Sequence, residues 1–254
     1  MKAILIAAGM GTRLRPLTEN LPKCLAVAGA GKTLFDTQID AFHACGIEDV
    51  IVIRGYKGDQ FKRVDVRYLW NHDFEKNNIL GSFMKASAEF TDDLLVSYSD
   101  IWFEPSIPQA LRQIDGDIVL AVDKEWRKTY VDRSDHPLAE AEVVELDNED
   151  FVRSIGKIAG ETGSFHAEFI GMMKLSRSGA ELFKNAYREV EKKFTGKPFQ
   201  RAAAFEKAYI TDMIQSLVNA GIKIKCFPIS GQWREIDTVQ DYKSLVALWQ
   251  SLNS

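Results

Sequence analysis

Short apolar runs alternate along the first half of the chain with segments in which apolar residues recur every three or four positions. The runs predict buried strands, and the spaced positions predict amphipathic helices. Strands are expected at residues 3–8, 50–53, 64–69, 94–98 and 118–122, and helices at 34–42, 79–90 and 105–114. This alternation is typical of an α/β fold, in which a Rossmann-like, mostly parallel sheet is flanked by helices.

The pattern changes after Asp123, because residues 124–165 are charged and irregular. Short strands are expected there at 142–146 and 151–158. Further strands are expected at 169–175, 222–227 and 233–236, and helices at 178–194, 203–220 and 242–249. No linker rich in Gly, Pro or Ser divides the chain. We therefore expect a single domain over residues 1–254, with a first half at about 1–122, an inserted segment at about 123–175 and closing elements at 176–254.

A glycine-rich loop follows the first strand and is the strongest motif, with the sequence Ala7-Ala-Gly-Met-Gly-Thr-Arg-Leu-Arg-Pro16. Glycines let a backbone approach a ligand closely and turn its N–H groups toward an anion. Arg13 can grip phosphate oxygens with a planar guanidinium, and Lys23 adds a compact charge. In open α/β sheets, ligands bind beyond the carboxyl ends of strands, where this loop lies. By itself, the short pattern is explained about equally well by a solvated surface turn.

Two other glycine motifs fit less well. A dinucleotide-binding fingerprint would need a third glycine where Leu14 stands. Residues 26–33 come close to a P-loop, with Ala26 in place of its first glycine and with Lys32-Thr33 at its end. A P-loop follows a buried strand, and Pro22 interrupts the segment that would have to form it. A P-loop kinase or NTPase is therefore disfavoured.

The charge is small overall but unevenly distributed. There are 32 Lys and Arg against 36 Asp and Glu, so the net charge is −4, which argues against a nucleic-acid partner. Residues 1–34 hold five basic residues and one acidic residue, 5 − 1 = +4, which suits a small anionic ligand. No apolar run approaches the roughly 20 residues that span a bilayer, and we expect no signal peptide before the first strand. With three widely spaced cysteines, we expect a cytoplasmic protein without a membrane partner.

Four motifs together resemble a known family, the nucleotidyltransferases that make activated sugars and activated head groups. The motifs are residues 1–23, Asn77-Asn-Ile-Leu-Gly-Ser82, Val96-Ser-Tyr-Ser-Asp100 and Glu235-Ile-Asp-Thr-Val-Gln-Asp-Tyr242. Residues 28–31 look one residue longer than usual. The resemblance implies a glycosyltransferase-A-like fold. It also implies that the nucleotide is bound by Ala7, Ala8, Gly9, Gly11, Thr12, Arg13, Gly81 and Ser82, within residues 1–122.

Two carboxylates follow strands and are expected on the same rim of the sheet. Asp100 follows the strand at 94–98, and Asp237 follows the strand at 233–236. Carboxylate pairs suit Mg²⁺, which takes oxygen ligands. Asp237 is placed equally well to cap the next helix, but the resemblance favours metal binding for both residues.

The resemblance implies nucleotidyl transfer, with Arg13, Lys23, Asp100 and Asp237 as the catalytic residues. An acceptor oxygen attacks the α-phosphorus of a nucleoside triphosphate, and pyrophosphate leaves in line. Such a reaction depends mainly on alignment and on cations where negative charge gathers. Lys23 would lie between the acceptor phosphate and the α-phosphate, and no general base is needed because the acceptor oxygen is already anionic.

The inserted segment points to one branch of this family. The Glu-Lys-Pro motif usual in hexose-1-phosphate enzymes is missing after Gly156-Lys157. Residues 123–126, 133–142 and 168–171 are similar instead to cytidylyltransferases that act on phosphocholine or 2-aminoethylphosphonate. This resemblance implies CTP and an acceptor that joins a phosphorus anion to an ammonium group. The acceptor-binding residues would be Trp126, Glu140, Glu142 and Glu168 at the ammonium end, and Arg133 and His136 at the anionic end.

Several alternatives remain open at this point. Trp126 is explained at least as well as a lid or core residue. A sugar-1-phosphate uridylyl- or thymidylyltransferase is the second functional hypothesis. The third is a silent nucleotide-sensing homologue, which would be expected to lose Lys23 or a metal carboxylate. A homo-oligomer is compatible with the sequence.

Overall fold

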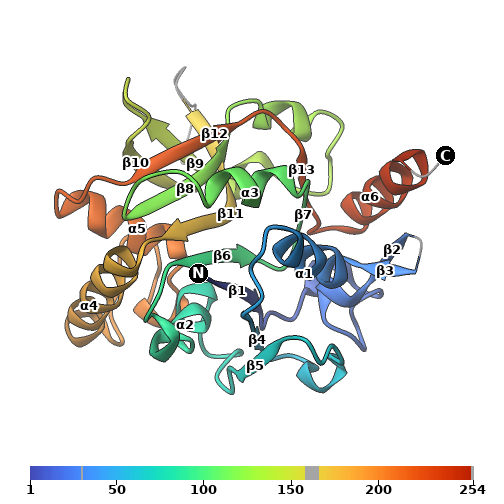
Figure 1. Cartoon of the computed structure of the whole chain (residues 1–254), viewed down its shortest axis with the longest axis horizontal. Helices are drawn as coiled ribbons and strands as arrows, with labels where there is room; N and C mark the ends of the chain where they lie inside the picture. Colours follow the sequence, from blue (N-terminus) through green and yellow to red (C-terminus); the bar gives the residue numbers. More distant parts are fainter. Residues whose placement is uncertain (30, 158–165, 253–254) are drawn as a thin grey trace.

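A nine-stranded sheet organises the chain (Figure 1), whose residues 1–29, 31–157 and 166–252 are described by the computed structural model. Its central path runs β10-β9-β11-β6-β1-β4-β5, and β8 pairs with β11 and β12. The strands are β1 (Lys2–Ala7), β4 (Val50–Arg54), β5 (Arg67–Trp70), β6 (Leu94–Tyr98), β8 (Ile118–Asp123), β9 (Glu142–Leu146), β10 (Val152–Lys157), β11 (His166–Leu175) and β12 (Lys225–Ile229).

Two small antiparallel sheets and six α-helices complete the described elements. The small sheets pair β7 (Ile101–Phe103) with β13 (Trp233–Glu235), and β2 (Val27–Gly29) with β3 (Lys32–Thr33). The helices are α1 (Leu34–Ala44), α2 (Ile79–Met84), α3 (Ser106–Leu111), α4 (Arg177–Phe194), α5 (Ile210–Asn219) and α6 (Val239–Leu252). None of the helices in the described ranges is both long and apolar enough to cross a membrane.

The predicted α/β architecture is confirmed. Strand β1 runs parallel to both β4 and β6, β4 runs parallel to β5, and β8 runs parallel to β12. The long strand β11 is antiparallel to β6, β8 and β9 and so joins the two parts of the sheet. Because β1 and β6 are parallel neighbours, the loops after Ala7 and Tyr98 leave the same edge of the sheet. This edge carries the site described below.

Each face of the sheet has its own apolar core, because successive side chains of a strand point to opposite faces. Ile4 and Ile6 of β1 pack in one core with residues of α2, α4 and α5. Ala3 and Leu5 pack in the other core with residues of α1, α3 and α6. Figure 1 shows helices on both sides of the sheet. The unbroken apolar run at residues 3–8 therefore reflects a strand, β1, that is buried on both faces.

Some predicted boundaries were wrong for local reasons. The helix predicted at 203–220 begins only at Ile210, and the turn before it at Phe205–Lys207 is a short 3-10 helix. Phe205 belongs to the core, where its ring lies 5.4 Å from those of Tyr187 and Phe199. Phe205 falls on the apolar spacing of the following helix although it lies before it, and this is why the predicted helix began too early. The end of the strand predicted at 151–158 lies outside the described residues.

The P-loop alternative does not fit the structure. Val27–Gly29 forms one strand of a short hairpin, not a central strand of the large sheet. Thr33 caps α1 through a reciprocal pair of hydrogen bonds with Asp36. Lys32 forms an exposed ion pair with Asp40.

Gly179 offers a test of how α4 packs against the sheet. A Cβ atom at this position would lie 1.9 Å from the carbonyl oxygen of Asp117, so only glycine allows the helix to come this close. We expect Gly179→Ala to destabilise the protein by about 1–3 kcal/mol through overpacking. Urea denaturation would measure the change. Glu181→Ala, at an exposed position of the same helix, should have little effect, and equal stability of the two variants would contradict the packing.

Candidate active site

A cavity of about 380 Å³ opens at the edge of the sheet where β1 and β6 end. Its wall is formed by the glycine loop, the start of α2, residues 136–142 and strands β11 and β13. Most residues singled out in the sequence line it, namely Ala7, Ala8, Gly9, Gly11, Thr12, Arg13, Lys23, Ser82, Asp100, His136, Glu140, Glu142, Glu168 and Asp237.

The glycine loop is shaped around Lys23. Gly11 has a φ of +56° and precedes the short helix Thr12–Leu14. A Cβ atom on Gly11 would lie 2.9 Å from the Cβ atom of Lys23. The hydroxyl of Thr18 donates a hydrogen bond to the carbonyl of Gly11 at 2.7 Å. Both the backbone conformation and the close approach therefore require glycine here.

Lys23 holds the two predicted carboxylates together. Its Nζ atom lies 2.8 Å from Oδ2 of Asp100 and 2.6 Å from Oδ1 of Asp237. Arg13 forms a further ion pair with Asp237. Burial alone would lower the pKa of Lys23, but Asp100 and Asp237 outweigh burial and raise that pKa above its usual range. Burial would likewise raise the pKa of Asp237, and Lys23, His136 and Arg13 together hold it far below its usual range.

The side chain of Asp237 does not cap α6, which was the alternative that the sequence left open. Thr238 and Asp241 together cap the start of α6, because Oδ2 of Asp241 accepts the N–H groups of Asp237 at 3.0 Å and Thr238 at 2.9 Å. The hydroxyl of Thr238 in turn accepts the N–H group of Asp241 at 3.2 Å. The side chain of Asp237 lines the cavity instead.

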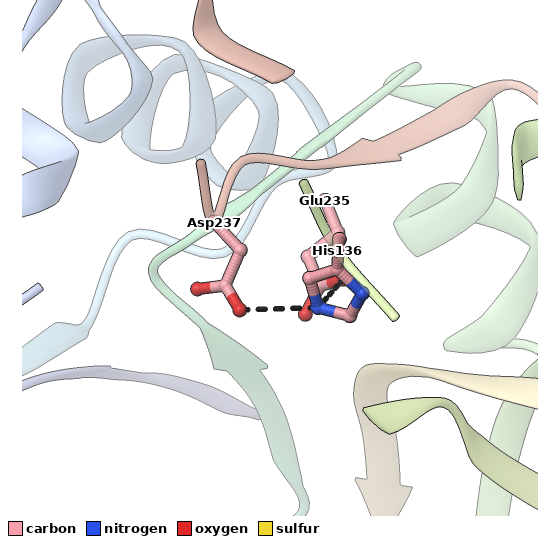
Figure 2. Close-up of side chains that lie close together, drawn as sticks. All are labelled: His136, Glu235 and Asp237. Carbon is pink, nitrogen blue, oxygen red and sulfur yellow. Dashed lines mark ion pairs between the residues drawn. The ribbon is translucent and has the colours of Figure 1, made fainter. Parts of the chain in front are cut away.

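The oxygen atoms at this end of the cavity fit a divalent cation. Oδ1 of Asp100 is buried, and no hydrogen-bond partner for it is found among the described residues. Nε2 of His136 lies 3.2 Å from Oδ2 of Asp237 and 3.4 Å from Oε2 of Glu235 (Figure 2). Ligand atoms of His136, Glu235 and Asp237 all lie within 4.8 Å of one another. Mg²⁺ prefers carboxylate oxygens to imidazole, so the carboxylates of Asp100, Glu235 and Asp237 are the candidate ligands at this end of the cavity.

Two carboxylates with raised pKa values, those of Glu168 and Glu142, line another part of the cavity. Glu168 is 3% exposed, and its Oε1 atom accepts a hydrogen bond from the hydroxyl of Tyr130 at 2.7 Å. Its Oε2 atom has no hydrogen-bond partner within the described part of the chain. Burial, assisted by the charge of Glu235, raises the pKa of Glu168 well above its usual value. Burial also raises the pKa of Glu142 to about 7.

Glu140 and Glu142 have defined partners in this region. Glu142 accepts hydrogen bonds from Thr211 at 2.8 Å and Tyr98 at 3.3 Å. Glu140 forms an ion pair with Lys157, whose ammonium lies 4.7 Å from the centre of the Tyr209 ring. Lys157 and Tyr209 also line the cavity.

Three of the predicted ligand contacts do not line the cavity. Trp126 is fully buried, packs with Ala141 and Val143, and lies 5.5 Å edge-on from Tyr130. It is a core residue of the inserted segment, as the alternative interpretation held. Gly81 lies on α2 and lines a second cavity of about 310 Å³.

Arg133 is the third correction. Its guanidinium forms ion pairs with Asp241 and Glu235 behind the wall of the cavity. These two carboxylates already satisfy its charge. The sequence alone could not reveal these partners, because they lie about 100 residues further along the chain.

Glu235 is the main site residue that the sequence interpretation missed. Burial and the charges of Asp237 and Asp100 raise its pKa, while Arg133 and His136 oppose the shift. A signal was present, because Glu235 and Asp237 are two positions apart and the end of a strand points such residues to the same face.

Comparisons with known proteins show the family of the chain. Residues 3–165 match the family described as the MobA-like NTP transferase domain. The chain belongs to this family. It is 30% identical over 252 residues to the CTP:phosphoglutamine cytidylyltransferase of Campylobacter jejuni, covering 95% of this chain and 97% of that protein.

Two further similarities concern phosphocholine enzymes of Streptococcus pneumoniae. The choline-phosphate cytidylyltransferase is 36% identical over 108 residues, which cover 41% of this chain and 47% of that protein. The solved structure of the CTP:phosphocholine cytidylyltransferase superposes with a TM-score of 0.72 at 24% identity, covering 97% of this chain and 98% of that one. The structural match supports the predicted fold, and the family match supports the nucleotidyltransferase resemblance.

The raised pKa of Glu142 predicts a pH dependence of stability. The folded protein holds a proton on Glu142 up to about pH 7, whereas the unfolded chain releases it near the ordinary value of 4.5. The folded state therefore binds more protons in this range, and this contribution to stability is lost as the pH rises from 4.5 to 7. Glu142→Gln should remove up to about 3 kcal/mol of this dependence.

Urea denaturation at several values between pH 5 and pH 8 would measure this effect. The stability of Glu142→Gln relative to the wild type should rise up to about pH 7 and then level off. Glu145→Gln, in the same strand but outside the cavity, is the matched control. A constant difference between Glu142→Gln and the wild type across this range would contradict the assignment.

Proposed function

We propose that the protein transfers CMP from CTP to a small phosphate or phosphonate that carries an ammonium group, with release of pyrophosphate. One observation carries the proposal: a single cavity holds Arg13 and Lys23 beside two carboxylates in one part, and half-buried Glu142 and buried Glu168 in another. The first part suits a metal-bound triphosphate, and the second suits a cation. A substrate pair with these charges would fill both.

The nucleotide would bind along the glycine loop. Backbone N–H groups around Gly9, Gly11 and Thr12 can meet phosphate oxygens, as glycine-rich loops commonly do. The backbone at Ala7 and Ala8, with Ser82 at the start of α2, would form the pocket for base and ribose. CTP is favoured because two relatives, the full-length match from Campylobacter jejuni and the partial match from Streptococcus pneumoniae, are named as cytidylyltransferases.

The charges around Lys23 suit the transfer step. Its raised pKa keeps the ammonium charged at neutral pH, so it can stabilise negative charge where the acceptor oxygen meets the α-phosphorus. Asp100 and Asp237 would hold Mg²⁺, which neutralises charge on the triphosphate. Arg13 would exchange its contact with Asp237 for phosphate oxygens. The acceptor oxygen needs no general base because it is already anionic.

The acceptor would place its ammonium group near Glu168 and Glu142. The unpartnered Oε2 atom of Glu168 is buried in the cavity wall, where a carboxylate without a cation is costly. An ammonium group beside it would remove that cost and keep Glu168 ionised. Phosphocholine and 2-aminoethylphosphonate have this combination of charges, so they are the first acceptors to test.

A substrate panel tests the proposal directly. The protein would be incubated with Mg²⁺, each of the four common nucleoside triphosphates, and phosphocholine, 2-aminoethylphosphonate or hexose 1-phosphates, and pyrophosphate release would be measured. CTP-dependent release with an amino-alkyl or choline-type acceptor is the expected result. Release only with UTP or dTTP and a sugar phosphate would favour the sugar-nucleotide alternative. Silence throughout would favour a regulatory homologue.

Lys23 and Asp100 should be essential for turnover. We expect Lys23→Ala and Asp100→Ala each to lower kcat at least about 100-fold, the scale seen when one contact to a transition state is removed. Thermal unfolding would confirm that each variant is folded. Lys32→Ala removes an exposed lysine that pairs with Asp40 and should retain normal kcat. Near-normal turnover of Lys23→Ala would refute the proposed chemistry.

A further inference from the structure

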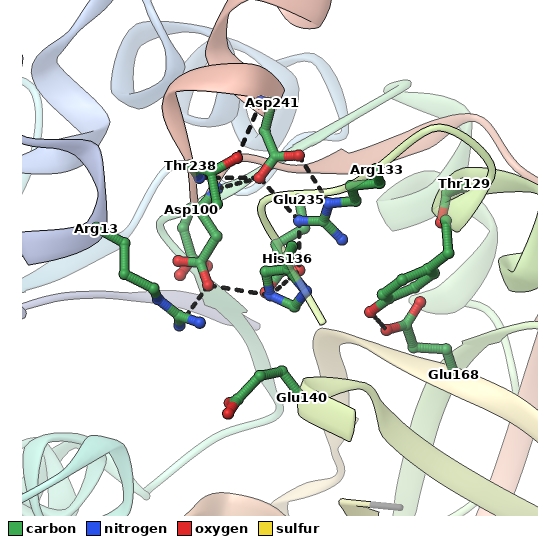
Figure 3. A network of polar contacts seen from close by, with 12 residues as sticks. Arg13, Asp100, Thr129, Arg133, His136, Glu140, Glu168, Glu235, Thr238 and Asp241 are labelled. Atoms are coloured by element: carbon green, nitrogen blue, oxygen red, sulfur yellow. Dashed lines mark hydrogen bonds and ion pairs between the residues drawn. The ribbon is translucent and has the colours of Figure 1, made fainter. Parts of the chain in front are cut away.

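Arg133 lies behind the cavity wall and joins the inserted segment to the start of α6. Its Nε atom donates to Oδ1 of Asp241 at 2.7 Å, and its Nη2 atom donates to Oδ2 of Asp241 at 2.9 Å. The same Nη2 atom lies 3.0 Å from Oε2 of Glu235 (Figure 3). The side chain is only 9% exposed. A two-point contact of this kind fixes both the position and the plane of the Asp241 carboxylate.

That carboxylate in turn holds the backbone of Asp237. Oδ2 of Asp241 accepts the N–H groups of Asp237 and Thr238 at the same time. The side chain of Asp237 meets Lys23 at 2.6 Å on the cavity side. A rotation of the Asp241 carboxylate would therefore release the turn that aims Asp237 at Lys23.

The guanidinium is itself held from the other side by Tyr130. The carbon at its centre lies 5.1 Å from the centre of the Tyr130 ring. The hydroxyl of Tyr130 is anchored on Glu168 at 2.7 Å. A stacked, planar cation of this kind cannot be replaced by lysine without losing both the fork and the stacking.

We infer that Arg133 is a positioning residue, which aims the carboxylate of Asp237 into the cavity by fixing Asp241. The inference rests on the proposed function only in that Asp237 is taken as a metal ligand. It assigns Arg133 a role behind the cavity wall, where it contacts neither substrate. Outer partners that orient a metal ligand contribute strongly to metal affinity.

The decisive variant is Arg133→Lys. It keeps the positive charge near Asp241 and Glu235, so that the buried carboxylates retain a cation and the fold is preserved. Hydrogen exchange, followed by NMR at single-residue resolution, would report on the amides of Asp237 and Thr238. Electron paramagnetic resonance with Mn²⁺ alone would report on metal affinity. Lys128→Gln is the matched control, because Lys128 lies in the same segment, is exposed and pairs with nearby Glu125.

The expected result is exchange at both amides about tenfold faster in Arg133→Lys, as loss of a charge-assisted contact implies. The dissociation constant for Mn²⁺ should rise at least about tenfold. The melting temperature should stay close to that of Lys128→Gln, which should match the wild type in every measurement.

Two results would overturn the inference. One is wild-type exchange at Asp237 and Thr238 in Arg133→Lys. The other is faster exchange together with unchanged Mn²⁺ affinity, since Asp237 would then be released without consequence. Failure of the wild type to bind Mn²⁺ would instead contradict the metal role proposed for Asp237, and amide exchange would still decide whether Arg133 holds the turn.

Discussion

The contact of one ammonium with two carboxylates is the constraint on which the site depends. Lys23 reaches Asp100 across 77 residues of sequence and Asp237 across 214. An unpaired charge in this setting would be costly, since a buried ion that loses its partner destabilises a protein strongly. The three segments that carry these residues must therefore meet, and the N–H group of Ile236 secures the meeting by donating to the carbonyl of Asp100 at 2.8 Å. Lys23, Asp100 and Asp237 of this junction line one part of the cavity.

The antiparallel strand β11 brings the carboxylate of Glu168 to the cavity. It pairs with β6, which leads to Asp100, and with β9, which begins at Glu142. This pairing delivers Glu168 to the wall within reach of the inserted segment. The arrangement lets one pocket hold a polyanion and a cation side by side, as the proposed reaction needs.

A layer of residues behind the wall sets the direction of those that line it. Asp241, Arg133 and Tyr130 form a continuous chain of polar and stacking contacts from α6 to Glu168. His136 contacts the carboxylates of Glu235 and Asp237, and its ring lies 5.8 Å from that of Tyr130. The inserted segment therefore supplies residues that hold the lining side chains in place as well as residues that line the cavity themselves. This explains why two of its residues that were predicted to touch the acceptor, Trp126 and Arg133, are turned away from the cavity.

The sequence by itself determined the α/β alternation, the glycine loop and the residues of the loop and strand ends that gather in one cavity. These features are local: apolar runs, a glycine that must adopt positive φ, and carboxylates placed directly after strands. Only the tertiary structure decided which polar residues face the cavity and which stand behind it. Whether Asp237 or Asp241 caps α6, and whether Arg133 meets a ligand or a carboxylate, depends on partners brought from distant segments. Charge and spacing along the chain do not indicate those partners, because the folded sheet decides which distant side chains meet.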